Sequence, residues 1–346
     1  MCVFEHCLDV CRGKRGIVVY PDGEDRRVVQ AALRLQQSGL ATPILLGRPM
    51  AIRAIQHSLG IGGTLWSMDH KMRQTLEANA AHYQQLQQKA GKQVTEEKAL
   101  EAVGCPLAAG ALMLKRGEAE LGIAGNLSST ADVLRAGLRI LGRQEKGGTV
   151  SSFFFMIAPG GEKLYIFTDG AVVPEPTSTQ LAHIAIGAGR TLESLMGIPA
   201  RVALLSFSTK KSAEHPRVQV VRDAVEEAKR MDPDLCLDGE LQFDAAITPE
   251  VAAQKAPGSP VAGRANVFVF PSLDAGNISY KVAQRLCGYT ALGPFLQGLA
   301  GGWHDLSRGC SADDVYKITV VGFGLHHGKQ HSQITVTGES QWKLSA

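Results

Sequence analysis

Short apolar runs recur along this chain, and each is followed by a turn and then by a polar or helically spaced segment. Residues 16–20, Gly-Ile-Val-Val-Tyr, end at a Pro-Asp-Gly turn that leads into a helical pattern. Further runs of this kind occupy residues 42–47, 120–125, 165–169, 202–210 and 267–270. Strands buried on both faces read as continuous apolar runs and alternate with helices along the chain. The pattern predicts an α/β fold, a parallel sheet with helices on both faces.

A polar, glycine-rich break at residues 144–148, Gln-Glu-Lys-Gly-Gly, separates two apolar segments. We place a domain crossover there, because linkers between domains are polar and rich in glycine. The 346 residues are enough for two domains. Residues 69–118 are expected to be largely helical, with a break between two helices at residues 104–106. Residues 237–244 are expected to form a turn that carries three carboxylates.

Composition excludes several functions. The net charge of +3 is small, and no run of Lys and Arg forms a stripe, so nucleic-acid binding has little support. The seven cysteines are odd in number and include no C-x-x-C pair, which argues against a disulfide framework or a structural zinc site and favours a reducing cytosol. A small anionic substrate remains compatible with this composition.

The two ends of the chain carry weaker patterns. Residues 1–16 contain an apolar stripe that includes Cys7 and Cys11, and we expect a short amphipathic helix packed on the body with both thiols buried. The segment after Val321 shows no apolar period and is expected to be loosely ordered. Its histidines, as weak metal candidates, are His326, His327 and His331.

The densest group of reactive side chains lies at residues 305–314, Asp-Leu-Ser-Arg-Gly-Cys-Ser-Ala-Asp-Asp, after a glycine-rich run. We expect a helix to begin there, and a helix start offers free N–H groups and a positive dipole end that suit a phosphate. The alternative is a capping box, because Ser311 precedes Asp314 by three residues. Local spacing alone favours the cap.

Polar side chains also follow two other expected strands. Residues 126–130, Asn-Leu-Ser-Ser-Thr, open a helix that carries Arg135, at the kind of strand end where α/β sheets bind ligands. The alternative there is an N-cap with polar neighbours. After the strand at 267–270, Asn277 and Lys281 share one helix face with Gln284 or Arg285. The alternative there is a solvated polar face, with the core side formed by Val282 and Leu286.

Three long stretches, residues 238–257, 262–284 and 293–314, closely resemble the phosphate acetyltransferase (phosphotransacetylase) family. The segments LLSFSTK and IAGNLSSTADVLRAGLRIL agree with it, and the resemblance runs from about Ile17 to about Val321. The form AGNLSST, with QGLAGG before the serine, looks most like the ethanolamine-utilisation branch. The resemblance implies reversible acetyl transfer between coenzyme A (CoA) and phosphate, both substrates. We expect no permanently bound cofactor and assign no metal-binding residue.

The same resemblance implies an architecture. Family members are usually homodimers of two α/β domains with the fold of isocitrate and isopropylmalate dehydrogenases, the second domain inserted in the first and the active-site cleft between them. Here domain I would comprise residues 1–148 plus 297–346, and domain II residues 149–296. We expect small-molecule partners, no nucleic acid and no membrane. The expected location is the cytoplasm, either free or within a bacterial microcompartment.

Three catalytic roles carry over residue by residue. By resemblance, Ser307 would stabilise the tetrahedral transition state, Arg308 would bind the acyl phosphate, and Asp314 would deprotonate the CoA thiol. A free thiol has a pKa of roughly 8.5, so a positioned base raises the thiolate fraction at the moment of attack. We expect direct attack in a ternary complex, because the sequence positions no His or Lys to activate the serine as a nucleophile.

Substrate and CoA binding are expected by resemblance at a larger set of positions: Arg27, Lys89, Ser128, Ser129, Thr130, Arg135, Asn277, Lys281 and Cys310. Arg27 and Arg135 would each offer a bidentate fork to a phosphate, although Arg27 could instead pair with Glu24 on the surface. Lys89 stands where the family has an arginine and lacks the fork. Cys310 is expected to have a lowered pKa near the helix start without being catalytic, or else to be a buried small residue.

Three rival interpretations stay open. One is a propionyl- or butyryl-preferring phosphotransacylase, since one methylene changes binding by only about 1–3 kcal/mol. Another is a non-catalytic acyl-CoA-sensing module of the kind fused behind malic enzymes, which the retained serine, arginine and acid, in a chain that begins at its own first strand, argue against. The third, a decarboxylating dehydrogenase, is disfavoured because no G-x-G-x-x-G follows a strand and no coherent set of metal-binding aspartates is present.

Overall fold

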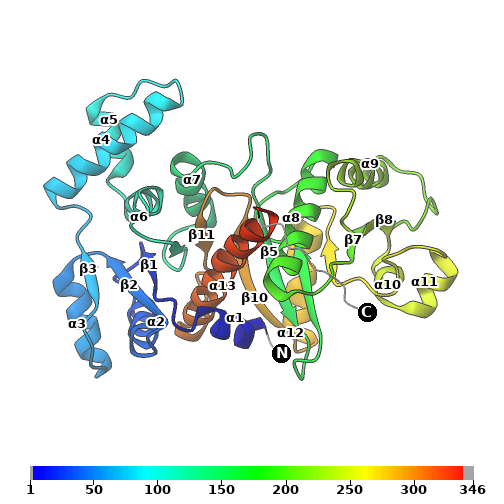
Figure 1. Cartoon of the computed structure of the whole chain (residues 1–346), viewed down its shortest axis with the longest axis horizontal. Helices are drawn as coiled ribbons and strands as arrows, with labels where there is room; N and C mark the ends of the chain where they lie inside the picture. Colours follow the sequence, from blue (N-terminus) through cyan, green and yellow to red (C-terminus); the bar gives the residue numbers. More distant parts are fainter. Residues whose placement is uncertain (1–2, 338–346) are drawn as a thin grey trace, which may run out of the picture.

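The structure, a computed structural model, describes the backbone of residues 3–337 and the side chains of residues 3–328. Its strands form two sheets, which lie side by side along the long axis in Figure 1. The first contains, in order across it, β11 (Gly302–Asp305), β4 (Leu121–Ala124), β1 (Gly16–Tyr20), β2 (Ala41–Leu46) and β3 (Trp66–Met68). The second contains β10 (Thr290–Gln297), β5 (Ser151–Ile157), β6 (Leu164–Thr168), β9 (Val267–Val269), β7 (Val202–Leu205) and β8 (Leu237–Leu241).

The α/β fold class is confirmed, with two local differences. All neighbouring pairs in the first sheet are parallel. In the second sheet the pairs β10–β5 and β5–β6 are antiparallel and the remaining pairs are parallel. The strand β3 was not predicted, because three partly exposed residues are too few to show a period.

The second sheet is inserted between two neighbouring strands of the first. All its strands lie between β4 and β11 in the sequence, yet β4 and β11 pair in parallel. The outgoing and returning segments contact each other, since Gln144 N donates to Gly298 O at 2.8 Å and Ala300 N to Gly142 O at 3.0 Å. The glycine-rich break and the glycine-rich return therefore lie side by side, at the amino-terminal end of β11.

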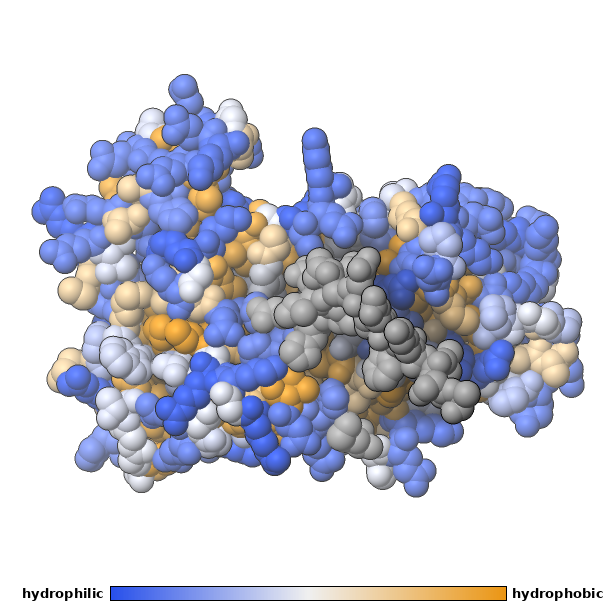
Figure 2. All heavy atoms as spheres, in the orientation of Figure 1, coloured by the Kyte–Doolittle hydropathy of each residue, from blue (hydrophilic) through white to orange (hydrophobic). Residues whose placement is uncertain are grey.

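Thirteen helices surround the sheets within residues 3–337: α1 (Val3–Cys11), α2 (Arg26–Gln37), α3 (Pro49–Leu59), α4 (Arg73–Lys89), α5 (Glu96–Val103), α6 (Pro106–Lys115), α7 (Thr130–Ile140), α8 (Ser178–Met196), α9 (Pro216–Met231), α10 (Phe243–Ile247), α11 (Pro249–Lys255), α12 (Leu273–Leu286) and α13 (Ala312–Thr337). The long helix α13 lies between the two halves in Figure 1 and packs on both α2 and α8. Helices α4 and α5 project as an arm, which is mostly hydrophilic in Figure 2. No described helix is long and apolar enough to cross a membrane.

The amino-terminal prediction is confirmed. Helix α1 packs against α13. Cys7 is fully buried and Cys11 nearly so, and burial raises the pKa of Cys11 to about 11. The amphipathic stripe of this segment therefore anchors it to the body of the protein.

The prediction of a loosely ordered segment after Val321 is wrong for the described residues. Helix α13 continues to Thr337, and Phe323 and Leu325 are buried. A Cβ at Gly324 would lie 2.5 Å from the Cys7 sulfur, so glycine gives close packing here without any hydrophobic signal in the sequence. Among described residues no group of three His, Cys, Asp or Glu could hold a metal, and the side chain of His331 lies outside them.

Two expectations about the second sheet are also wrong. Val282 and Leu286 are 45% and 81% exposed rather than in the core. Helix α12 instead packs through Tyr280, which stacks on Phe154 with ring centroids 4.0 Å apart. The predicted turn at residues 237–244 is mostly the strand β8, whose apolar pattern is broken by two buried carboxylates that find cationic partners.

Candidate active site

The carboxyl edge of the first sheet brings three turns together. Strands β1, β4 and β11 run parallel, so the segments that follow them meet at one edge. Leu306 N donates to Ala124 O at 2.7 Å and so ties the third turn to β4. The buried carboxylate of Asp22 joins the first two turns, because it accepts from Gly125 N at 3.0 Å and from the Ser128 hydroxyl at 3.2 Å.

Asp305, the last residue of β11, is a second buried carboxylate at this edge. Its Oδ2 accepts from the Thr130 hydroxyl at 2.6 Å. A Cβ at Gly125, whose φ is +110°, would lie 2.1 Å from its Oδ1, so only glycine fits there. Burial raises the pKa of Asp305 to about 6, against the opposing effect of the Thr130 hydrogen bond. The motifs of the sequence predict no role for Asp22 or Asp305. An acid directly at the end of a buried strand was the available signal.

The turn after β11 exposes the side chains that the sequence singled out. Ser307 and Arg308 are exposed, whereas Cys310 is only 7% exposed. The Ser307 hydroxyl oxygen accepts from Gly309 N at 3.3 Å, so its own proton remains available to another acceptor. No described hydrogen bond joins this hydroxyl to a His or Lys.

Helix α13 begins at Ala312, after a capping box. Asp314 N donates to the Ser311 hydroxyl at 3.1 Å, and Ser311 N donates to Asp314 Oδ2 at 2.8 Å. The cap is therefore present, and the helix does not extend back to Ser307. Asp314 is exposed and its Oδ1 takes no part in these bonds, so the role as a base stays a prediction.

Arg27 lies between the three turns and uses all five of its side-chain donors. Nε and Nη2 donate to the two carboxylate oxygens of Asp25 at 3.0 and 2.8 Å. Nη2 also donates to Asn126 O at 3.1 Å, and Nη1 donates to Arg308 O at 2.8 Å and Cys310 O at 2.9 Å.

Two expectations at this site are wrong. Arg27 does not pair with Glu24, whose Oε2 accepts from Arg48 at 2.7 Å instead. The Cys310 thiol does not have a lowered pKa, because burial raises it to about 11 and the nearby charge of Arg27 only partly offsets this. The preference for the thiolate at a helix start is therefore outweighed by loss of solvent.

The hydroxyls after β4 are engaged within the protein. Those of Ser128 and Thr130 donate to buried carboxylates, and Ser129 caps α7 by accepting from Asp132 N at 3.2 Å. The N-cap alternative is thus realised, while ligand binding by these residues stays a prediction. Arg135 is 60% exposed and pairs with Asp132 only at the surface. Its guanidinium can therefore turn to a ligand.

The remaining candidates lie elsewhere. Lys89 is the exposed last residue of α4. Asn277 and Lys281 share a face of α12 as predicted, since Lys281 Nζ donates to Asn277 Oδ1 at 2.7 Å and Asn277 Nδ2 to Gly170 O at 2.9 Å. No described hydrogen bond joins these three to the turn at Ser307.

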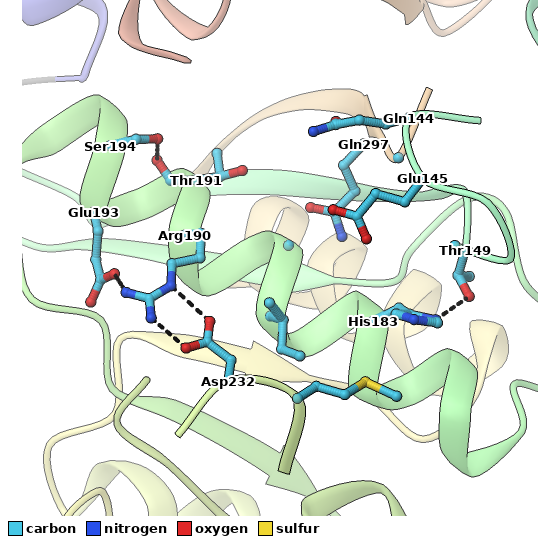
Figure 3. Close-up of a pocket in the computed structure, with 15 residues that line it drawn as sticks. Gln144, Glu145, Thr149, His183, Arg190, Thr191, Glu193, Ser194, Asp232 and Gln297 are labelled. Atoms are coloured by element: carbon cyan, nitrogen blue, oxygen red, sulfur yellow. Dashed lines mark hydrogen bonds and ion pairs between the residues drawn. The ribbon is translucent and has the colours of Figure 1, made fainter. Parts of the chain in front are cut away.

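A cavity of about 950 Å³ lies away from this edge, beside the two crossover segments (Figure 3). Gln144 and Gly298 line it on one side, and α8 lines it on the other. Its only cationic Arg or Lys among the described lining residues, Arg190, is paired with Glu193 and Asp232 (Figure 3). The exposed turn, which carries the side chains of Ser307 and Arg308, therefore stays the predicted site.

A two-sheet α/β fold that exposes a serine and an arginine at the carboxyl edge of a parallel sheet is typical of α/β proteins that bind small anionic ligands. The sequence model of the family described as phosphate acetyl/butaryl transferase matches residues 2–322. The chain belongs to this family and is therefore an acyltransferase.

Individual relatives agree with this assignment. The chain is 40% identical over 322 residues to the phosphate acetyltransferase of Thermoanaerobacterium thermosaccharolyticum, covering 92% of this chain and 97% of the relative. A phosphotransacetylase structure from Streptococcus pyogenes aligns with a TM-score of 0.88 at 39% identity, covering 95% and 98% of the two chains. The EutD phosphotransacetylase from Staphylococcus aureus gives 0.84 at 39% identity, covering 94% and 98%. The last similarity is consistent with the ethanolamine-utilisation branch.

Proposed function

We propose that the protein is a phosphate acetyltransferase that interconverts acetyl-CoA and phosphate with acetyl phosphate and CoA. Both family and relatives support this reaction. The observation that carries the site assignment is the turn after β11. It exposes Ser307, Arg308 and Asp314, while the buried carboxylates of Asp22 and Asp305 accept hydrogen bonds from the turn and helix start that follow β4. Domain I is proposed at residues 1–148 plus 297–346, and domain II at 149–296.

In the proposed mechanism the CoA thiol attacks the carbonyl carbon of acetyl phosphate. Asp314 takes the thiol proton through Oδ1, the carboxylate oxygen outside the capping box. The S–C bond forms, the carbonyl oxygen becomes an oxyanion that accepts from the Ser307 hydroxyl, and collapse breaks the C–O bond to phosphate. Arg308 holds the departing phosphate through its fork. No acyl-serine forms in this scheme.

The test measures acetyl-CoA formation from acetyl phosphate and CoA by the purified protein and by Ser307→Ala. Loss of one oxyanion donor should lower kcat by about 10²–10³-fold. Ser307 is exposed, so the melting temperature should stay within about 2 °C. Ser194→Ala, a change in α8, serves as the matched control. A wild-type protein that binds acetyl-CoA but releases no CoA or phosphate would instead be a sensing module.

Acyl length needs its own experiment, because the matched family includes both acetyl and butaryl transferases. We propose acetyl as the preferred group, as supported by the relatives at about 40% identity. Turnover should be compared with acetyl-CoA, propionyl-CoA and butyryl-CoA at equal concentration. A kcat/KM that rises from acetyl to butyryl would assign the protein to the longer-chain transferases.

We further propose a homodimer. Helix α12 exposes Ile278 (61%), Val282 (45%) and Leu286 (81%), spaced four apart on one face. A second copy is the proposed occupant, in line with the dimers that the resemblance implies. Leu286→Lys should shift the mass measured by light scattering from dimer to monomer, whereas the same change at exposed Met50, outside this face, should not. An unchanged dimer in Leu286→Lys would place the interface elsewhere.

The proposed partners are small molecules, CoA and acetyl phosphate, with no permanent cofactor. A cytoplasmic setting is supported by the seven cysteines of the sequence, which are odd in number, include no C-x-x-C pair and suit a reducing compartment. Enclosure within a microcompartment is supported only by the similarity to a EutD phosphotransacetylase. Localisation of the tagged full chain during growth on ethanolamine would test this setting.

A further inference from the structure

We propose that Arg27 is a positioning residue, which holds the turn carrying Ser307 and Arg308 in its reactive shape, and not a ligand of CoA or phosphate. This inference rests on the proposed function for the meaning of "reactive". Arg27 belongs to the first turn of α2, while its Nη1 donates to carbonyls of the turn after β11. Its Nη2 donates to Asn126 O of the turn after β4. One side chain therefore joins all three turns.

The two carbonyls that accept hydrogen bonds from Nη1 lie on either side of Gly309. They belong to Arg308 and Cys310, at 2.8 and 2.9 Å. Glycine is the most permissive backbone position, so a turn centred on it needs outside contacts to keep one conformation. Holding the carbonyl of Arg308 also holds the backbone of this residue, whose side chain is proposed to bind the phosphate. A displacement of about 1 Å in such a group can cost about 10²-fold in rate.

The neighbourhood of Arg27 also opposes anion binding. Asp25 accepts from the guanidinium through both oxygens, and its side chain is only 10% exposed. Burial would raise the pKa of Asp25, but the hydrogen bonds from Arg27 outweigh it and lower the pKa. The carboxylate therefore stays charged beside Arg27, and a phosphate bound there would be repelled by it. Arg308 and Arg135 are both more exposed than Arg27 and are open to a substrate.

Two substitutions separate positioning from binding. Arg27→Gln should lower kcat by about 10²-fold while the KM values for CoA and acetyl phosphate change less than about threefold. Asp25→Asn should also lower kcat, by about tenfold, because it releases the guanidinium from its anchor. If Arg27 binds an anion, Asp25→Asn removes an opposing charge and lowers KM instead, which is the opposite result.

The matched control is Arg34→Gln. Arg34 also lies on α2, but it contacts α13 instead of the turn, through an exposed ion pair with Asp313 at 2.7 Å and over the ring of Tyr316 at 3.8 Å. Among the described residues no hydrogen bond joins Arg34 to the turn at 307–311. Because exposed pairs contribute little, kcat and both KM values should stay within about twofold of wild type. A loss as large as that of Arg27→Gln would assign the effect to general loosening between the two helices.

Cys310 provides a readout that does not depend on activity. Its thiol is buried, has a raised pKa and lies 3.9 Å from Arg27 Nη1. Peptide mass spectrometry after a timed pulse of iodoacetamide should show slow labelling at Cys310 in the wild type. Arg27→Gln should speed that labelling at least about tenfold, with the exposed Cys105 as internal reference. Arg34→Gln should leave it unchanged.

These measurements distinguish the failure of each idea. Faster labelling together with a fall in kcat at constant KM supports positioning. Unchanged labelling with a raised KM overturns it and makes Arg27 a substrate ligand. A wild type without transferase activity refutes the proposed function, while the labelling still tests the contact between Arg27 and the turn.

Discussion

The carboxyl edges of the two sheets carry similar residues and use them differently. At the first sheet Arg27 and two buried carboxylates hold the turns, and Ser307 and Arg308 remain exposed. At the second sheet the charges pair with one another: Lys210 with Asp238, and Arg222 with Glu240. Asp238 and Glu240, both on β8, are at most 3% exposed.

The difference shows that a polar strand end is not by itself a site. In the second sheet every strong charge at β8 has a described partner, so the cluster stabilises the fold. In the first sheet a similar network holds the turns in place. Among the described residues it leaves the side chains of Ser307 and Arg308 without an acidic partner. A substitution in the second network should therefore cost stability, whereas one in the exposed turn should cost rate.

The largest expected effect is on stability, from Asp238→Ala. Asp238 accepts from Lys210, Ser259 and Gly239 N, and removing one partner of a buried pair typically costs about 3–5 kcal/mol. We expect the free energy of unfolding, measured in urea, to fall by about 3 kcal/mol, the lower end of this range, because Lys210 can reach water. Asp244→Ala, which breaks an exposed pair with Lys255, is the control and should cost less than about 1 kcal/mol. Equal losses in the two variants would remove the distinction between the buried and exposed pairs.

The two edges should also respond to pH with opposite sign. Burial raises the pKa of Asp305 to about 6, so the folded state keeps a proton that the unfolded state loses near pH 4. Stability from this group is therefore present at low pH and falls as pH rises through about 4 to 6. For Asp238, burial would raise the pKa, but Lys210 and Ser259 lower it, so its contribution is lost as pH falls.

Asp305→Asn isolates the first effect, because the amide oxygen can still accept from Thr130. Relative to this variant the wild type should lose up to about 3 kcal/mol of unfolding free energy between pH 4 and 7, from 1.36 kcal/mol per pKa unit. Urea unfolding at several pH values measures the difference. Parallel curves for the two proteins would mean that Asp305 is ionised in the folded state over the whole range.

The sequence predicted the alternating elements and the residues of the exposed turn, because buried runs and a dense polar motif are local signals. It did not predict what Arg27 contacts, since the partner carbonyls of Arg308 and Cys310 lie 281 and 283 positions away. Main-chain acceptors carry no side-chain signature. The role of Asp305 was missed for a related reason, because its burial depends on the close approach of Gly125.

Two further errors had the same cause. The buried side of α12 uses Gly276 and Tyr280, so its most hydrophobic stripe faces outward and was assigned to the core in the alternative interpretation. In β8 the carboxylates interrupt the apolar period, and only their partners on distant segments make burial tolerable. Non-local pairing decides both cases, and a single sequence does not report it.

Asp314→Asn separates the two roles of Asp314 at the start of α13, which are capping of the helix and the proposed removal of the thiol proton. An amide oxygen can still accept from Ser311 N, but it cannot take a thiol proton, so kcat should fall about 10²-fold with little change in stability. Ser311→Ala should show the reverse, a loss of about 1 kcal/mol from the cap with kcat within about threefold. Retained activity in Asp314→Asn would leave Asp314 with the capping role alone.

The smallest expected effect is that of Arg135→Gln, which tests whether exposure marks a binding cation. Arg135 lies on α7 and pairs with Asp132 three residues earlier, at the surface. If it binds a CoA phosphate, KM for CoA should rise about tenfold, the size expected for one charge-assisted hydrogen bond, with kcat nearly constant. The melting temperature should move by no more than about 2 °C. Arg139→Gln, one turn further along the same exposed helix, is the matched control. A KM that is unchanged in both variants would show that exposure alone does not identify a ligand, and would leave Arg308 as the main candidate cation at this edge.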